Sequence, residues 1–400
     1  MKYFAPVLFA VLLVGCNMTA EESHDPQLMA RADSLAQSMI IVDGHIDVPY
    51  RLNMRYEDIS VEAGGDFDYP RAVQGGLNAP FMSIYIPASY EETGGARALA
   101  DSLIDMVYGF EEQWPDKFAV ATSVADVRDH FERGLMSLPM GLENGTGIED
   151  DPANLQHFYD RGIRYVTLTH SADNLIGDSS YDTTRSHRGL TEFGREVVRE
   201  MNRLGIMVDI SHVSDDTFYD VLDVTEVPPI ASHSSARHFT PGFERNMSDD
   251  MIRALADAGG IIMINYGSSF ISEDYRTRRA AATEEIAAYF EENPDLTQDE
   301  RRDYFNDYMR ENVGYADIDD VMAHFDHVID LVGVDYVGIG SDYDGVGDSL
   351  PTGLKDVASY PNLVYKLLER GLSDDDIAKI LGENLLRIWE QAEAYAADRS

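Results

Sequence analysis

Residues 206–212 read Ile206-Met207-Val208-Asp209-Ile210-Ser211-His212, a short apolar run that leads into a histidine. The chain contains eight such runs, and most stop at, or one residue before, a residue that can bind a metal or move a proton. Helical patterns separate most of the runs, as at residues 192–204 and 249–258. Strands and helices that alternate about eight times predict an α/β protein, a (β/α)8 barrel of the TIM type. The eight runs lie at residues 39–42, 81–86, 138–142, 165–169, 206–210, 229–232, 261–264 and 336–340.

Such a barrel brings the C-terminal ends of its strands together at one mouth, where side chains from distant parts of the chain converge. A chain of 400 residues with 44% hydrophobic side chains can form one barrel with insertions. We therefore expect a single catalytic domain at residues 28–396. Metal-binding residue types at several strand ends indicate a metal-dependent hydrolase.

The N-terminus has a different character. Residues 4–14 form an apolar run that is too short to span a bilayer and ends in Leu13-Val14-Gly15-Cys16. This pattern resembles the lipobox of bacterial lipoproteins, in which the chain is cut before the cysteine and the cysteine is acylated. An ordinary secretory signal is the alternative, but Cys16 is the only cysteine. We expect a signal peptide at 1–16, lipidation at Cys16, a polar tether at 17–27, and an exported protein anchored by lipid to the bacterial cell envelope.

The charge balance restricts the partners. The chain has 31 basic and 72 acidic residues, a formal net charge of −41. Nucleic acids and anionic lipid surfaces are therefore not expected partners, and membrane contact is expected only through the lipid anchor. With one cysteine, the chain has no internal disulfide.

Five side chains at strand ends are candidate metal ligands. His45 and Asp47 follow the first run two residues apart, so both point to the same side of a strand. Glu143 lies between glycines and could bridge two cations, although a turn acid is the simpler local interpretation. His212 and His233 follow consecutive runs, about one strand-helix unit apart. Imidazoles and carboxylates without a thiolate suit zinc or a similar cation.

Further candidates follow other runs. His170 ends the fourth run and could bind a metal or hold a substrate oxyanion. Asp342 follows the eighth run and could take a proton from metal-bound water and pass it to a leaving amine. His324 and His327, three residues apart on a helical stretch, are predicted to lie on a solvated helix face. The highly charged segment 275–312 predicts a pair of solvated helices, with a lid or a dimer contact as the alternative.

Short motifs occur in the order typical of one enzyme family over about residues 40–389. They are Asp43-Gly44-His45-Ile46-Asp47, Gly141-Leu142-Glu143-Asn144-Gly145, Leu168-Thr169-His170-Ser171, Gly189-Leu190-Thr191, Asn202-Arg203-Leu204-Gly205, Asp209-Ile210-Ser211-His212-Val213-Ser214, Ser232-His233-Ser234-Ser235-Ala236, Arg245-Asn246, Gly340-Ser341-Asp342-Tyr343-Asp344-Gly345 and Gly382-Glu383-Asn384-Leu385-Leu386-Arg387. Together they resemble the membrane dipeptidase (renal dipeptidase) family of zinc peptidases, which belongs to the amidohydrolase-like barrels.

The resemblance implies a binuclear zinc site. One zinc would be held by His45 and Asp47 and the other by His212 and His233, with Glu143 bridging the two ions. It also implies small peptide substrates and a homodimer.

The resemblance also implies the substrate contacts. His170 matches the substrate-contacting histidine, Arg245 matches an arginine that pairs with the terminal carboxylate, and Asp342 matches the acid near the bound water. A family tyrosine near that carboxylate falls on Phe270, which has no hydroxyl, and Tyr266 is a candidate substitute.

The predicted reaction is hydrolysis of short dipeptides, including those with a C-terminal D-residue. Two cations about 3.5–4 Å apart can share a hydroxide and clamp the scissile carbonyl. Hydrolysis of N-acyl amino acids or cyclic amides would use the same metals and is the alternative. A binding protein without catalysis would be expected to have lost one or more ligands, and here the full set is present. A structural envelope protein would not need this set of convergent polar residues.

Overall fold

Eight parallel strands form the central sheet in the computed structural model, which describes residues 25–399. Neighbouring strands follow one another in chain order, apart from a separate parallel pair, β3 (Phe118–Ala119) and β4 (Met136–Ser137). Each of the eight apolar runs overlaps one strand of the central sheet. The strands are β1 (Ile41–Ile46), β2 (Leu77–Tyr85), β5 (Met140–Glu143), β6 (Ile163–Thr167), β7 (Met207–Asp209), β8 (Ile230–Ala231), β9 (Ile261–Ile264) and β10 (Val337–Ile339).

The first and last strands close the sheet at its C-terminal end. The Asp47 N–H donates to the carbonyl of Tyr343 at 2.9 Å, and the Asp342 N–H donates to the carbonyl of His45 at 3.1 Å. These two bonds cross the gap between β1 and β10 and make a nearly closed barrel. The predicted (β/α)8 fold is confirmed.

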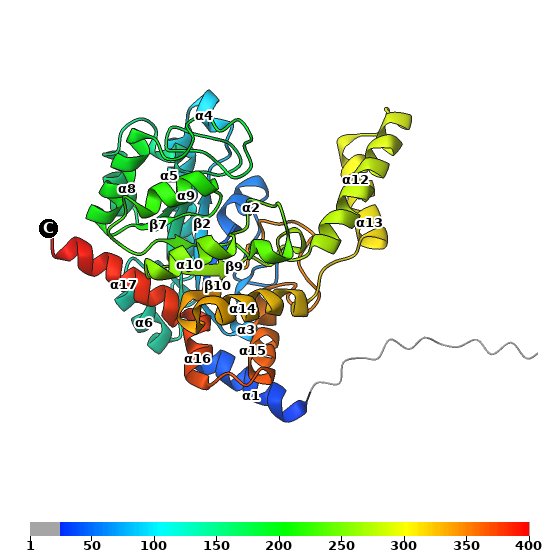
Figure 1. Cartoon of the computed structure of the whole chain (residues 1–400). Coiled ribbons are helices and arrows are strands. Elements are labelled where there is room, and N and C mark those ends of the chain that lie inside the picture. The colour runs from blue at the N-terminus through cyan, green and yellow to red at the C-terminus, as the bar shows by residue number, and fades with distance from the viewer. Residues whose placement is uncertain (1–24, 400) are drawn as a thin grey trace, which may run out of the picture.

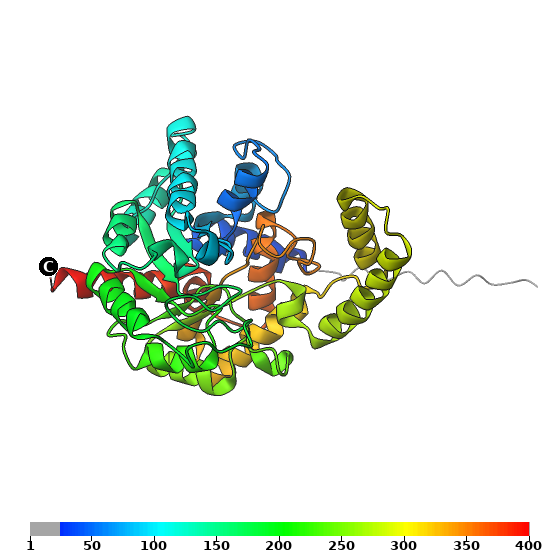
Figure 2. The same cartoon turned by 90° about the horizontal axis from the view of Figure 1, so that it is seen from above.

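Helices surround the barrel and connect its strands (Figures 1 and 2). Several begin at a Ser or Thr whose hydroxyl accepts a bond from a backbone N–H three residues later, as at Thr191, Ser214 and Ser248. The α-helices are α1 (Pro26–Ser38), α2 (Val48–Met54), α3 (Tyr69–Gly75), α4 (Tyr90–Thr93), α5 (Ala96–Gln113), α6 (Val124–Arg133), α7 (Asn154–Asp160), α8 (Glu192–Leu204), α9 (Asp215–Leu222), α10 (Asp249–Asp257), α11 (Ser268–Ile271), α12 (Glu273–Glu292), α13 (Gln298–Asn312), α14 (Ile318–Val332), α15 (Tyr360–Glu369), α16 (Asp374–Ala378) and α17 (Asn384–Ala397). Shorter helical turns are η1 (Gly145–Ile148), η2 (Arg237–Phe239), η3 (Val334–Tyr336), η4 (Val357–Ser359) and η5 (Lys379–Glu383).

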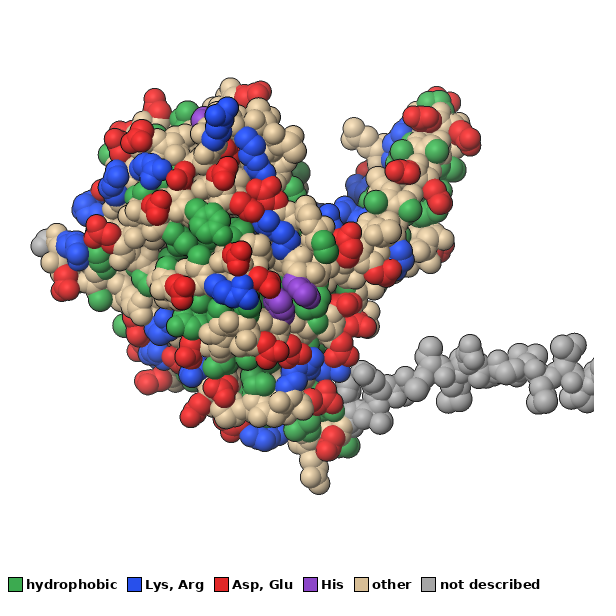
Figure 3. Space-filling model, in the orientation of Figure 1, with side chains coloured by type: hydrophobic (Ala, Val, Ile, Leu, Met, Phe, Trp, Pro, Cys, Tyr) green, Lys and Arg blue, Asp and Glu red, His purple; other side chains and the backbone are tan. Residues whose placement is uncertain are grey.

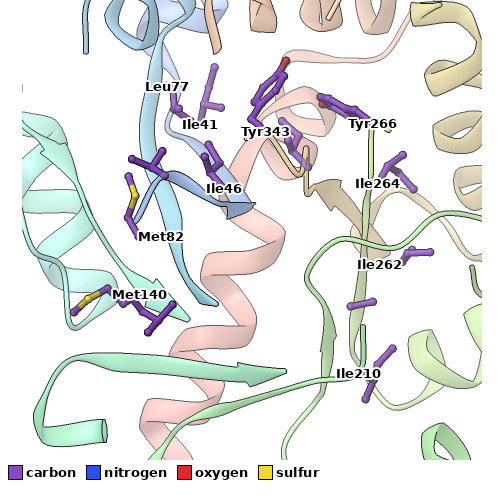
Figure 4. Close-up of a cluster of buried hydrophobic side chains, with 14 of the residues drawn as sticks. Ile41, Ile46, Leu77, Met82, Met140, Ile210, Ile262, Ile264, Tyr266 and Tyr343 are labelled. Atoms are coloured by element: carbon purple, nitrogen blue, oxygen red, sulfur yellow. The ribbon is translucent and has the colours of Figure 1, made fainter. Parts of the chain in front are cut away.

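The core has two layers, because strands of a closed barrel are buried on both sides. One layer includes the buried cluster of Figure 4, where side chains such as Ile46, Met82 and Ile264 are labelled. The other contains Phe81, Tyr165 and Trp389 of α17; the Phe81 ring centroid lies 5.2 Å from that of Tyr165 and 5.4 Å from that of Trp389. The backbone at Gly141 allows this packing, because a Cβ there would lie 2.0 Å from the Tyr165 ring.

Helix α1 forms the start of the described domain. Helix α1 begins at Pro26, two residues before the boundary predicted at residue 28. The predicted signal peptide and Cys16 lie outside the described residues, so lipidation stays a prediction. Within residues 25–399, no helix is both long and apolar enough to cross a bilayer.

Helices α12 and α13 form a hairpin that projects from the barrel (Figures 1 and 2). The two predicted helices are present, and they bury a small apolar cluster between them that includes Ala282, Ile286 and Met309. The hairpin, called the arm below, is therefore held together by packing of its own as well as by its solvated charges.

The prediction for His324 is wrong. This side chain of α14 is fully buried, and its Nδ1 accepts a bond from the Ala236 N–H at 3.0 Å. Its Nε2 lies 3.1 Å from the carbonyl oxygen of Ile271 and donates to it. A neutral imidazole satisfies both partners, and burial lowers the pKa of His324 to about 4.

Stability should therefore fall in acid partly because of His324. In the unfolded chain, His324 binds a proton with an ordinary histidine pKa of about 6.5, whereas in the folded protein its pKa is about 4. The free energy of unfolding therefore decreases as the pH falls from about 6.5 towards 4. This group should account for about 3 kcal/mol of lost unfolding free energy between about pH 7 and pH 4. Urea unfolding of wild type and His324→Gln at several pH values measures this. An equally steep pH dependence in His324→Gln would contradict the prediction.

Candidate metal centre

The C-terminal ends of the strands surround a cavity of about 840 Å³ at the mouth of the barrel. All but one of the predicted metal ligands line it, together with His170 and Asp342. The exception, His45, is fully buried beside them. A bridge between Ile46 and Tyr343 joins the ends of the first and last strands, so Asp47 lies beside Asp342. The closed barrel thus brings together residues from opposite ends of the domain.

Glu143 lies at the centre of this site, and its two oxygens face different histidines. Its Oε2 lies 3.3 Å from the Nε2 of His45. Its Oε1 lies 3.3 Å from the Nε2 of His212 and 3.4 Å from the Nε2 of His233. A carboxylate in this position can contact two cations, one through each oxygen.

The other candidate ligands lie close to the histidines and to Glu143. Asp47 Oδ2 lies 3.5 Å from His45 Nε2, and His170 Nε2 lies 3.7 Å from Glu143 Oε1. Three overlapping groups each bring one ligand atom per residue within 4.8 Å of the others. They are His45, Glu143 and His233; Glu143, His170 and His212; and His45, Asp47 and Asp342.

The donor atoms fit divalent cations. The buried Nε2 of His45 has no hydrogen-bond partner, and the Nε2 atoms of His212 and His233 face one another at 2.8 Å. Ligands bound to tetrahedral zinc at about 2.0–2.1 Å lie about 3.3 Å apart, close to the separations around Glu143. The residues present therefore suit a pair of zinc-like ions.

Neighbouring hydroxyls orient two of the imidazoles. The Tyr165 hydroxyl lies 2.8 Å from His45 Nδ1, and the Ser232 hydroxyl lies 2.7 Å from His233 Nδ1. Because each Nδ1 is engaged, the Nε2 atom of each ring is directed towards Glu143. Partners of this kind fix the tautomer and the orientation of a metal-binding histidine.

The carboxyl groups of the site differ in their electrostatics. Burial opposes ionisation of Glu143, but His45, His212 and His233 outweigh it and hold its pKa well below the usual range. Burial, followed by the charge of Asp47, raises the pKa of Asp342 well above its usual range. Asn265 Nδ2 also donates to Asp342 Oδ2 at 2.7 Å, which fixes this carboxyl. Glu143 is therefore ionised and suited to bind a metal, whereas Asp342 is suited to carry a proton.

Three residues at strand ends have left-handed backbone conformations that are costly for side chains other than glycine. They are Asn144 (φ 78°), His212 (φ 70°) and Asp342 (φ 62°). Such conformations persist only where surrounding contacts enforce them. Two of them, His212 and Asp342, line the cavity.

The sequence interpretation missed two buried carboxylates beneath the site. Asp43 accepts bonds from the His45 and Ser341 N–H groups at 3.1 and 3.0 Å. Asp209 accepts bonds from the Ser211 and Ser232 N–H groups at 3.0 and 2.8 Å. Each joins the ends of two strands. The available signals were Asp209 inside an otherwise apolar run and Asp43 directly after one.

Arg245 lies beside the site, and two further arginines line its cavity. Arg245 is 3% exposed and donates to Ser234 Oγ and to the His233 carbonyl, both at 2.8 Å. Its Nε has no hydrogen-bond partner. Among the described residues, the arginines that line the cavity are Arg276 and Arg279 of α12, which sequence reasoning missed.

The aromatic side chains near Arg245 settle one expectation. Phe270 lines the cavity, and its ring centroid lies 5.4 Å from the Arg245 guanidinium carbon. Tyr266 is fully buried against Tyr343 and does not replace the missing hydroxyl. Tyr181 does line the cavity, and burial raises its pKa against the opposing charge of Arg245. It places a phenol on the same side of the cavity as Arg245.

Removing the Tyr165 hydroxyl should lower the metal affinity of the site. Tyr165→Phe keeps the ring that fills the barrel but removes the partner of His45 Nδ1, so metal affinity should fall about 10–100-fold. Competition with a chelator measures this affinity. Tyr343→Phe is the matched control, because the Tyr343 hydroxyl bonds to the Leu354 carbonyl instead. Equal affinities in the two variants would exclude the orienting role.

Comparison with known proteins agrees with this geometry. A profile of the family described as membrane dipeptidase (Peptidase family M19) matches residues 29–400. A protein of Schizosaccharomyces pombe, called an uncharacterised dipeptidase, is 34% identical over 370 residues, which cover 88% of this chain and 81% of that protein.

Solved structures share the fold. The probable dipeptidase PvdM from Pseudomonas aeruginosa has a TM-score of 0.79 at 24% identity, over 92% of this chain and 99% of that chain. A metallopeptidase from Rhodobacter sphaeroides, solved with a phosphinate mimic of the dipeptide L-Ala-D-Ala, has a TM-score of 0.73 at 25% identity. That match covers 88% of this chain and 99% of the other. As its motifs predict, the chain belongs to the membrane dipeptidase family, M19, whose members are metallopeptidases that hydrolyse peptide bonds.

Proposed function

We propose that the protein uses two zinc ions to hydrolyse short dipeptides, including those with a D-residue at the C-terminal position. The observation that carries this proposal is the position of Glu143, whose oxygens face His45 on one side and His212 and His233 on the other. The Rhodobacter sphaeroides relative, solved with a mimic of L-Ala-D-Ala, supports the D-residue.

The ligand assignment follows the two sides of Glu143. His45 and Asp47 would hold one ion, His212 and His233 the other, and Glu143 would contact both. When bound, two such ions polarise a carbonyl and make a water acidic enough to attack it near neutral pH.

Asp342 and His170 would move the proton and stabilise the developing charge. The raised pKa of Asp342 lets its carboxyl hold a proton and return it to the departing amine nitrogen. Burial lowers the pKa of His170, so its imidazole is neutral and can donate a hydrogen bond to the carbonyl oxygen of the substrate.

The arginines near the mouth favour substrates with carboxylates. Arg245 is held rigidly by Ser234 and His233, and its unpartnered Nε remains able to donate. Arg276 stacks over the Phe243 ring at 3.8 Å, and Arg279 Nη1 donates to Ser269 Oγ at 3.3 Å. These two cations would attract a second carboxylate, such as an acidic side chain of the dipeptide.

Metal content and cleavage should be measured together. Purified protein should contain about two zinc ions per chain and cleave a panel of L-L and L-D dipeptides. A chelator should abolish cleavage, and added zinc should restore it. Absence of metal, or cleavage that resists complete metal removal, would refute the proposal. Two zinc ions without dipeptide cleavage would favour hydrolysis of N-acyl amino acids or cyclic amides instead.

Substitution of Arg276 or Arg279 should change substrate preference. Arg276→Ala and Arg279→Ala should each raise KM about fivefold for dipeptides with an acidic side chain, the effect of one partly exposed ion pair. The kcat for neutral dipeptides should change little. Arg278→Ala is the control, because Arg278 lies on the same helix but does not line the cavity. An equal effect on acidic and neutral dipeptides would exclude the second carboxylate.

A further inference from the structure

A second cluster of metal-binding side chains lies outside the cavity. His238 belongs to η2, Asp249 is the first residue of α10, and His327 lies on α14. One ligand atom from each lies within 4.8 Å of the others. None of the three lines the cavity of the metal centre.

The geometry of the cluster suits a cation. His327 Nε2 lies 2.8 Å from Asp249 Oδ1, and the rings of His238 and His327 stack with centroids 4.5 Å apart. His238 is exposed, and the side chains of His327 and Asp249 are 18% and 37% exposed, so an ion from solvent can reach them. Figure 3 shows histidine next to acidic side chains on the face of the molecule that carries α10 and α14.

We propose that His238, Asp249 and His327 form a third divalent-cation site, separate from the metal centre. Two imidazoles and a carboxylate are a common donor set for zinc and other borderline cations. Three protein ligands leave further coordination positions to solvent. The net charge of −41 favours the approach of cations to this surface.

A cation here would join three separate elements. Phe239 of η2 packs against His324 and His327, with ring centroids 4.5 and 5.6 Å apart. His324 in turn binds the Ala236 backbone. The segment between His233 and Arg245 thus rests on α14, and an ion held by His238 and His327 would fasten it there. Binding should therefore raise thermal stability.

The test measures zinc uptake by the metal-loaded protein, with no use of its activity. Equilibrium dialysis against zinc should give one more bound ion per chain for wild type than for His238→Ala or His327→Ala, whose affinity at this site should fall at least about tenfold. Zinc should also raise the melting temperature of wild type more than that of either variant.

The matched control is His157→Ala. His157 Nε2 lies 2.8 Å from Asp101 Oδ1, the same separation as in the His327–Asp249 pair, but no group of three includes it among the described residues. This variant should keep the extra zinc ion. His238 is exposed, so His238→Ala decides the matter if His327→Ala fails to fold. Equal zinc uptake by wild type and His238→Ala would overturn the proposal.

Discussion

The burial of one carboxylate, Glu143, is the constraint on which the rest of the site depends. An ionised carboxyl group shielded from water is stable only where opposite charge or hydrogen-bond donors surround it. Ser83 donates to Glu143 Oε2 at 3.0 Å, and three imidazoles from β1 and from the loops after β7 and β8 complete its surroundings. These elements must converge for Glu143 to be buried at low cost, so the barrel and the site stabilise one another.

Side chains, as well as the strand ladder, hold the mouth of the barrel in shape. Strands β7 and β8 pair through a single register contact, Asp209 with Ile230, and the Asp209 carboxylate supplies bonds that a longer ladder would provide. Asp43 has the corresponding role where β1 meets β10. This fastening accounts for the persistence of unfavourable backbone conformations at His212 and Asp342.

The fold could be predicted from sequence because strands buried on both faces read as continuous apolar runs. The convergence of His45, Glu143 and His212 followed from the shared position of strand ends. His324 could not be placed in this way, because spacing along a helix does not say which side faces the barrel. Arg276 and Arg279 were missed because they lie on an insertion whose direction depends on tertiary packing.

The same helix that carries Arg276 and Arg279 continues into the arm. Helix α12 runs without interruption from Glu273 to Glu292, so the wall of the cavity and the distant hairpin are two ends of one rod. Its outer half is braced against α13 through Ile286 and Met309. Because the helix is continuous, a change in the orientation of the arm would also move Arg276 and Arg279 at its other end. The position of the arm and the shape of the substrate entrance are therefore coupled through α12.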